Sequence, residues 1–168
     1  MLIRVDTSSV DQTRAIAATI AELMRPGDLV LLAGDLGAGK TSFTQGFGFG
    51  LGVTAPITSP TFTIAQVYEG RLRLHHLDVY RLDQLSEAVD VGLNELLDEG
   101  GVTVIEWGDH ILPVLPADFL EIKLSYGEED DDREVSLRAV GGRWASRHRA
   151  LQSAVASWCA DGDLTLDD

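Results

Sequence analysis

The sequence predicts an α/β fold: a three-layer domain in which helices cover a central sheet of mixed parallel and antiparallel strands. Short apolar runs of the buried-strand type occur at residues 29–33 and 102–105, and segments with helical spacing lie around them. A glycine-rich turn joins the first apolar run to a helical segment, as in α/β units. Two pairs of alternating segments are typical of hairpins, so the sheet is not expected to be purely parallel.

The N-terminal part of the chain predicts helix, strand and helix in turn. Ser9, followed three residues later by Gln12, forms a capping box that opens a helix over about residues 10–24. The strand 29–33 comes next, and a second helix over about residues 40–51 follows the glycine-rich turn. This order of strand, glycine-rich turn and helix is the one that a phosphate-binding loop requires.

The remainder of the chain predicts two hairpins, a further buried strand and more helix. In chain order, the expected elements are strands 61–68 and 72–80 joined at Glu69-Gly70, two short helical patterns within 83–98, strand 102–105, strands 119–126 and 133–140 with the acidic run Glu128–Asp132 at their tip, and a helix over about 143–160. We therefore expect one domain over residues 1–142, a C-terminal helix over 143–160 packed on it or extending from it, and an acidic tail over 161–168.

Length and composition favour a single acidic domain. The 168 residues are 45% hydrophobic and 24% charged, with a formal net charge of −14. Such a chain repels phosphate as a whole, which argues against non-specific nucleic-acid binding. Cys159 is the only cysteine, which excludes an internal disulfide and a cysteine-based metal site. With no apolar run of membrane-spanning length and no signal-peptide core at the N-terminus, we expect a cytoplasmic protein without membrane contact.

The glycine-rich turn carries the strongest functional signal. Residues 34–41, GDLGAGKT, fit the pattern GxxxxGK[ST] at every fixed position. The glycines permit a loop whose backbone N–H groups point inward toward an anion, and the following helix adds its positive dipole. Lys40 is expected to reach the β- and γ-phosphates, and Thr41 to offer its hydroxyl to Mg²⁺. We therefore predict a P-loop NTPase-like domain whose nucleotide-binding residues include Asp35, Leu36, Gly37, Ala38, Gly39, Lys40, Thr41 and Ser42.

Two acidic residues in predicted strands are candidates for metal and hydrolysis chemistry. Glu106 ends a buried strand, as a Walker B acid does, and is expected at the same sheet edge as the phosphate loop. It could hold Mg²⁺ or act as a base on the attacking water. Strand alternation puts His76, Asp78 and Tyr80 on one face, which is either a polar wall of the site or a solvated edge. His75 is predicted to face solvent.

A hydroxyl-rich loop follows the second helix. The segment TSPTFT at residues 58–63 precedes a strand. Such a loop can close over the γ-phosphate as a switch segment does, or it can be an ordinary Ser/Pro turn. Trp107, next to Glu106, is interpreted as a core or rim aromatic or as part of a partner surface.

Four motifs follow one another in the sequence: LGAGKT at residues 36–41, SPTFT at 59–63, the HxDxYRL block at 76–82 and IEWGD at 105–109. In this order they resemble the TsaE family, also known as YjeE. The family consists of small bacterial P-loop ATPases required for the threonylcarbamoyl modification of adenosine 37 in tRNA. The resemblance covers about residues 8–142. It implies an Mg²⁺-dependent ATPase that binds ATP and ADP.

The resemblance also implies roles for individual residues. The implied catalytic residues are Lys40, Asp78, Glu106 and Thr61. The implied metal ligands are Thr41, Asp78 and Glu106. Thr13 and Arg133 join the nucleotide-binding residues, and Ser59 and Trp107 match the family's switch-like and active-site region. The chain departs from the family in the helix 143–160 and the acidic tail, which exceed the usual length, and in the highly charged hairpin tip.

Protein partners are implied by the same resemblance. In the family, TsaE binds TsaD, which transfers the threonylcarbamoyl group, together with TsaB, and ATP hydrolysis resets that pair. Contact with tRNA would then be indirect, which agrees with the acidic composition. A small-molecule kinase and a nucleotide-gated binding module with negligible turnover remain open as alternatives. A GTPase and a transporter ATPase are disfavoured, because the sequence contains neither an [NT]KxD segment nor an LSGGQ-like signature.

Overall fold

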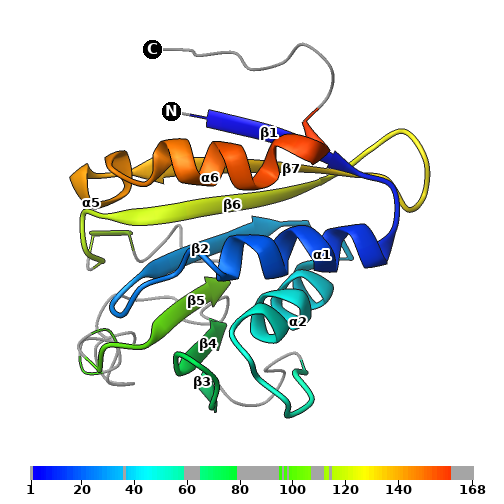
Figure 1. The fold of residues 1–168 in the computed structure, drawn as a ribbon. Coiled ribbons are helices and arrows are strands. Elements are labelled where there is room, and N and C mark those ends of the chain that lie inside the picture. The colour runs from blue at the N-terminus through cyan, green and yellow to red at the C-terminus, as the bar shows by residue number, and fades with distance from the viewer. Residues whose placement is uncertain are drawn as a thin grey trace.

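The computed structural model describes residues 2–35, 37–58, 65–78, 99–106 and 115–159, together with residues 95, 97, 112 and 113. Within these ranges the strands form one sheet in the order β1-β7-β6-β2-β5-β4-β3 (Figure 1). The strands are β1 (Leu2–Thr7), β2 (Leu29–Gly34), β3 (Ala65–Tyr68), β4 (Leu74–Asp78), β5 (Val102–Glu106), β6 (Phe119–Tyr126) and β7 (Arg133–Val140). The helices are α1 (Val10–Ala21), α2 (Lys40–Gly50), α5 (Gly142–Ala145), α6 (His148–Val155) and the 3₁₀ turn η2 (Ala156–Trp158).

The sheet is mixed, as the sequence predicts. Its centre is parallel, because β2 pairs with β5 and β6, and β4 pairs with β5, all in the same direction. Its flanks are antiparallel, through the pairs β1–β7, β6–β7 and β3–β4. The predicted α/β class with a mixed central sheet is therefore confirmed. Parallel inner strands bring their carboxyl ends to one edge, which is where ligands bind in such sheets.

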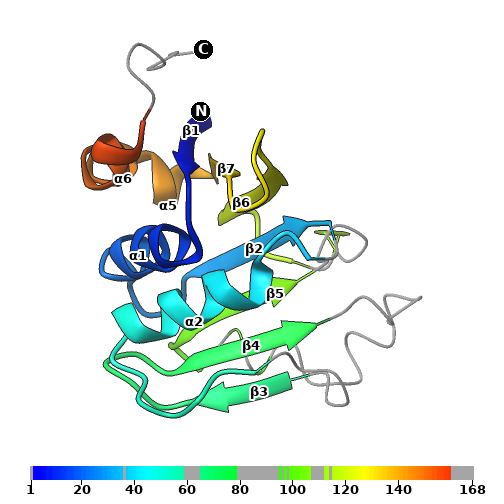
Figure 2. The same cartoon turned by 90° about the vertical axis from the view of Figure 1, so that its right-hand side faces the viewer.

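Helices α1, α2 and α6 lie on one face of the sheet (Figure 2). Their apolar side chains, among them Ile16, Phe43, Phe47 and Leu151, belong to one buried cluster together with strand residues. A smaller cluster on the opposite face contains Leu29, Leu31, Leu77, Ile105 and Phe119, with Leu97 and Leu115 against it. The predicted helical patterns within 83–98 lie outside the described residues, apart from positions 95 and 97.

Strand β1 is absent from the sequence prediction. Ile3, Val5 and Thr7 point into the protein, while the residues between them are exposed. The strand adds antiparallel to β7, with Val5 opposite Val135. Its alternation covers only six residues, half of them polar. Such a short pattern gains its strand conformation from tertiary pairing with β7 rather than from a strong local preference.

Helix α1 begins with the predicted capping box in a slightly altered form. The Ser9 hydroxyl accepts a 3.1 Å hydrogen bond from the backbone N–H of Gln12. The Gln12 side chain in return accepts from the backbone N–H of Ser8, at 2.8 Å, instead of from that of Ser9. The helix ends at Ala21, before the predicted end at about residue 24. No helix in the described ranges is long and apolar enough to cross a membrane.

The predicted single helix over 143–160 is divided into α5, α6 and η2. Arg147 stands between α5 and α6, and its side chain is buried against Asp28 at the start of β2. Trp144, Leu151 and Val155 belong to the main apolar cluster. The break in the helix lets both Trp144 and Arg147 turn inward toward the domain. The predicted tail 161–168 lies outside the described residues.

Candidate nucleotide-binding site

The loop between β2 and α2 has the backbone of an anion cradle. Gly37 and Gly39 adopt φ values of 82° and 102°, which residues with a side chain rarely adopt. Gly39 is the N-cap of α2 and provides no side-chain acceptor to the helix. The first N–H groups of a helix have no acceptor within the helix, which makes the start of a helix suited to an anionic ligand. Leu36, also predicted to bind nucleotide, lies outside the described residues.

Lys40 lies inside this loop, only 8% exposed. Its Nζ donates hydrogen bonds to the carbonyl oxygens of Gly34 at 2.6 Å and Asp35 at 3.1 Å. Burial lowers the pKa of Lys40, while the negative charges of Glu106, Asp78 and Asp35 act in the opposite direction. The ammonium group therefore sits between loop carbonyls and nearby carboxylates, in a position to exchange carbonyl contacts for phosphate oxygens.

The two candidate acids are neighbours at the carboxyl edge of the sheet. Glu106 on β5 has a partner on each neighbouring parallel strand. Asp78 lies opposite it on β4, and Leu32 lies opposite it on β2. Strand β2 continues from Leu32 into the phosphate loop, so both acids meet the edge from which the loop departs. Glu106 is 4% exposed and Asp78 is half-buried. This is the edge where the sequence predicts Glu106.

His76 contacts Glu106 directly. The His76 Nε2 atom lies 2.8 Å from Oε2 of Glu106, and both side chains are buried. The burial of His76 excludes the solvated edge for this residue, and a polar wall of a site stays a prediction for the face that carries His76 and Asp78. Tyr80, the third residue of that predicted face, lies outside the described residues.

The prediction that His75 faces solvent is wrong. His75 is 1% exposed, because β4 lies between β3 and β5 and both of its faces are covered. Burial lowers the pKa of His75, against the opposing charge of Glu99. The residue lies on the sheet face opposite His76, because adjacent strand residues alternate.

The oxygen ligands at this edge suit a metal that arrives with a nucleotide. Thr41 follows Lys40 in the first turn of α2, and Asp78 and Glu106 lie close to Lys40. No group of three or more His, Cys, Asp or Glu side chains in the described ranges could hold a metal by itself. Mg²⁺ commonly uses one or two carboxylates together with waters and phosphate oxygens. Thr41, Asp78 and Glu106 fit that incomplete ligand set.

Arg133, at the start of β7, connects the late hairpin to the phosphate loop. Its Nε donates a 2.9 Å hydrogen bond to the carbonyl oxygen of Ala38. Its Nη1 donates to the carbonyl oxygens of Asp130 and Asp132, at 2.7 and 2.8 Å. The guanidinium carbon lies 4.7 Å from the centre of the Tyr126 ring. The hairpin thus holds a planar cation beside the loop.

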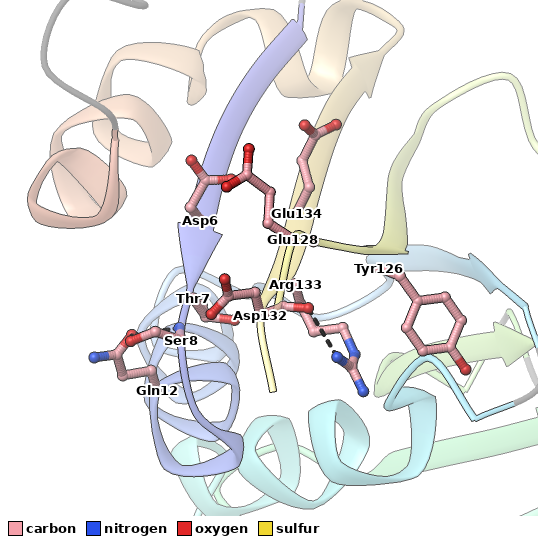
Figure 3. Close-up of a pocket in the computed structure, with 10 residues that line it drawn as sticks. Asp6, Thr7, Ser8, Gln12, Tyr126, Glu128, Asp132, Arg133 and Glu134 are labelled. Carbon is pink, nitrogen blue, oxygen red and sulfur yellow. Dashed lines mark hydrogen bonds between the residues drawn. The ribbon is translucent and has the colours of Figure 1, made fainter. Parts of the chain in front are cut away.

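A cavity of about 780 Å³ opens beside the hairpin, and Arg133 is part of its lining (Figure 3). Its walls come from the end of β1, the turn into α1 and the hairpin between β6 and β7. The lining residues are Asp6, Thr7, Ser8, Gln12, Tyr126, Gly127, Glu128, Asp132, Arg133 and Glu134. Arg133 is the only cation among them, so the cavity is acidic overall.

Tyr126 was missed by the sequence analysis. Its hydroxyl lies beside Gly37 of the loop. A side chain at position 37 would place its Cβ only 2.9 Å from this hydroxyl oxygen. The available signal was the predicted hairpin itself, whose first strand ends at residue 126 and whose second begins at 133. Tyr126 and Arg133 are paired across that hairpin.

Thr13 is 2% exposed, and its hydroxyl is already engaged in the protein. It lies 2.7 Å from the hydroxyl of Thr7 and donates a 3.3 Å hydrogen bond to the carbonyl oxygen of Ser9. These bonds fasten the start of α1 to β1. A role of Thr13 toward nucleotide stays a prediction. The predicted site residues Ser59, Thr61 and Trp107 lie outside the described residues.

Comparison with known proteins gives the family. The family model for threonylcarbamoyl adenosine biosynthesis protein TsaE matches residues 7–135. The chain belongs to the TsaE family. A TsaE protein of Bacillus subtilis, named tRNA threonylcarbamoyladenosine biosynthesis protein, is 46% identical over 139 residues, covering 82% of this chain and 86% of the relative. The equally named Treponema pallidum TsaE is 42% identical over 129 residues, with 77% and 95% coverage.

A solved TsaE-like structure has the same fold. The crystal structure of Bacillus subtilis YdiB superimposes with a TM-score of 0.78 at 38% sequence identity. The superposition covers 91% of this chain and 95% of YdiB. The family model ends at residue 135, within β7, so α5 and α6 lie beyond the matched TsaE segment.

Proposed function

We propose that this TsaE family member is an Mg²⁺-dependent ATPase of the cytoplasm that supports threonylcarbamoyl modification of adenosine 37 in tRNA by acting on the TsaB–TsaD complex. The ATPase part depends on one observation, the meeting of Lys40, Asp78 and Glu106 at the sheet edge where the phosphate loop begins. The tRNA part is supported by the names of the relatives, which are tRNA threonylcarbamoyladenosine biosynthesis proteins.

Phosphate binding is assigned to the loop and the first turn of α2. Backbone N–H groups at residues 39–42 would surround the β-phosphate, and Lys40 would transfer its hydrogen bonds from Gly34 and Asp35 to phosphate oxygens. Burial lowers the pKa of Lys40, and the negative charges of Glu106, Asp78 and Asp35 offset part of that cost in favour of the protonated amine. A protonated amine is the form that binds phosphate.

Hydrolysis is assigned to the two acids and Thr41. Thr41 and Asp78 would hold Mg²⁺, with Glu106 as a further ligand or as the group that orients the attacking water. Mg²⁺ bound with ATP would neutralise the charge that develops on the transferred phosphoryl group. Glu106 is buried, so its carboxylate is shielded from bulk water and has a fixed environment.

The ribose and base are assigned to the cavity beside Arg133. Arg133 bonds to Ala38 of the loop and also lines the cavity, so a nucleotide with its phosphates in the loop could extend past this side chain. Carboxylates such as Asp132 and Glu134 are suited to hydroxyl and amino groups and unsuited to further phosphate. The acidic lining therefore favours a neutral sugar and base.

The net negative charge of the chain supports the proposal that it acts on a protein complex. With a formal net charge of −14, the chain has little capacity to bind tRNA by itself. An ATPase that acts on a protein complex needs no cationic surface for the RNA.

The test is hydrolysis of Mg-ATP by the purified protein, alone and with the TsaB–TsaD pair of the same organism. We expect slow hydrolysis alone and a strong increase with the pair. Glu106→Gln should bind ATP and fail to hydrolyse it, whereas Glu129→Gln at the exposed hairpin tip should match the wild type. Tight ATP binding with no turnover under any of these conditions would refute the ATPase and favour a gated binding module.

A further inference from the structure

The buried pair of His76 and Glu106 is built by the register of two parallel strands. Asp78 lies opposite Glu106, and His76 lies opposite Val104. His76 is therefore on the same sheet face as Asp78 and Glu106, two residues before Asp78 in β4. From there its Nε2 reaches Oε2 of Glu106 at 2.8 Å. The exposed fractions of the two side chains are 0% and 5%. The contact is therefore shielded from water on both sides.

The chemistry of the pair explains why a histidine stands at this position. A buried carboxylate is costly without a hydrogen-bond donor, and the imidazole Nε2–H supplies one. The other ring nitrogen, Nδ1, is buried without a hydrogen-bond partner among the described residues. An unpartnered buried nitrogen costs free energy that an apolar side chain would avoid. The histidine is thus unfavourable as core packing, and its contact with Glu106 is the compensating feature.

The bond leaves the two carboxylate oxygens of Glu106 in different situations. Oε2 is engaged by the ring, whose own position is fixed by β4, while Oε1 has no hydrogen bond to another described residue. A carboxylate held through one oxygen cannot rotate freely about its last bond. Fixing a reactive group in this way is the usual effect of a supporting hydrogen bond behind a catalytic residue.

We infer that His76 is a positioning residue for hydrolysis, which holds Oε2 of Glu106 so that Oε1 is presented to the attacking water. This inference rests on the proposed ATPase function. His76 itself touches neither nucleotide nor water in this scheme. It acts only through Glu106, and its removal should affect turnover more than nucleotide affinity.

The variants separate positioning from packing. His76→Leu removes the donor and keeps a buried side chain, whereas His76→Gln offers an amide N–H near the place of Nε2. His75→Leu is the matched control, because His75 is the neighbouring residue, is equally buried and lies on the opposite sheet face. Circular dichroism and calorimetric ADP affinity would be measured for each variant.

For His76→Leu we expect ADP affinity close to that of the wild type and single-turnover hydrolysis slower by about 10- to 100-fold. His76→Gln should recover part of the rate, and His75→Leu should hydrolyse like the wild type. A wild-type rate in His76→Leu, or a loss of ADP affinity as large as the loss of rate, would overturn the inference.

A second measurement does not depend on activity. In ¹⁵N spectra of the imidazole ring, the wild type should carry its proton on Nε2, and the Nε2 signal should shift in Glu106→Gln. A proton on Nδ1 alone in the wild type would overturn the inference. If the wild type hydrolyses no ATP while the Nε2 signal still responds to Glu106→Gln, the proposed function fails and the hydrogen bond stands.

Discussion

Arg147 and Asp28 form a buried bidentate ion pair, although they are 119 positions apart in the sequence. The guanidinium donates from Nη1 to Oδ2 at 2.6 Å and from Nη2 to Oδ1 at 2.7 Å. Asp28 also accepts from the backbone N–H of Arg25 at 2.7 Å. Because Asp28 directly precedes β2, the C-terminal segment is fastened to the strand that leads into the phosphate loop. The segment beyond the matched family region is thus part of the domain.

Replacing Arg147 should destabilise the whole domain. Arg147→Met leaves the Asp28 carboxylate buried without its main partner, and losing one member of a buried pair typically costs about 3–5 kcal/mol. Urea unfolding followed by circular dichroism would measure the loss. Arg149→Met, an exposed neighbour on α6, should change the free energy of unfolding by less than about 0.5 kcal/mol. Equal stability of the two variants would contradict the role given to the ion pair.

Truncation after Arg143 should have a larger effect than Arg147→Met. It removes Trp144, Leu151 and Val155 from the main apolar cluster in addition to the ion pair. Loss of three buried apolar side chains costs several kcal/mol, which is comparable to the stability of a typical domain. We expect an unfolded or aggregated product by circular dichroism and gel filtration. A folded truncated protein that binds ADP normally would show that the C-terminal segment is peripheral.

Lys40→Ala should remove most of the affinity for nucleotide. The amine would otherwise form charge-assisted hydrogen bonds to phosphate, and their loss corresponds to about 2–3 kcal/mol, or on the order of 100-fold in Kd. Calorimetric titration with ATP gives the value. Lys123→Ala is the matched control, because Lys123 is the only other lysine and is exposed on β6. Unchanged affinity in Lys40→Ala would contradict the assignment of the phosphate loop.

Gly39→Ala tests the backbone of the loop without a steric collision. A Cβ at Gly39 meets no atom within 4 Å, but the φ of 102° is unfavourable for alanine. We expect a cost of about 1–2 kcal/mol, which appears as weaker ADP binding if the loop shifts to relieve it. Gly142→Ala is the control, since it also meets no atom and its φ is not in the left-handed range. Equal ADP affinity in both variants would show that the loop tolerates the change.

The positions of the glycine-rich loop and of the two acids at one sheet edge were predictable because their signals are local. The pattern in residues 34–41 fixes glycines, lysine and threonine relative to a strand and a helix, and Glu106 follows directly from the end of an apolar run. Parallel strands bring such ends together without further information. The hairpin of β6 and β7 was predicted with its observed bounds, since alternation continues over eight residues in each strand.

The features that were missed depend on the order of strands in the sheet. Strand β1 has a weak pattern and exists through its pairing with β7. The burial of His75 follows from β4 being an inner strand, and alternation alone cannot distinguish an inner strand from an edge. The pair of Asp28 and Arg147 joins distant segments through one side-chain contact, for which a single sequence carries no signal.

His75 gives a prediction about pH. Burial lowers its pKa below the ordinary value of 6.5, and the Glu99 carboxylate 3.3 Å from Nε2 only partly opposes this. The folded state therefore resists the proton that the unfolded state accepts near pH 6.5. Stability from this group is fully present above pH 6.5 and is lost as the pH falls from 6.5 toward the lowered pKa of the folded state.

Urea unfolding of the wild type and His75→Leu at two pH values, about 7.5 and about 5.5, would measure this contribution. Carboxylates and His148, whose pKa is also lowered by burial, respond in both proteins and cancel in the comparison. The loss of stability on acidification should be smaller in His75→Leu, by about 1 kcal/mol or less. His148→Leu should act in the same direction as an independent check. An equal loss in the wild type and His75→Leu would show that the neutral state of His75 contributes nothing to the acid sensitivity of the fold.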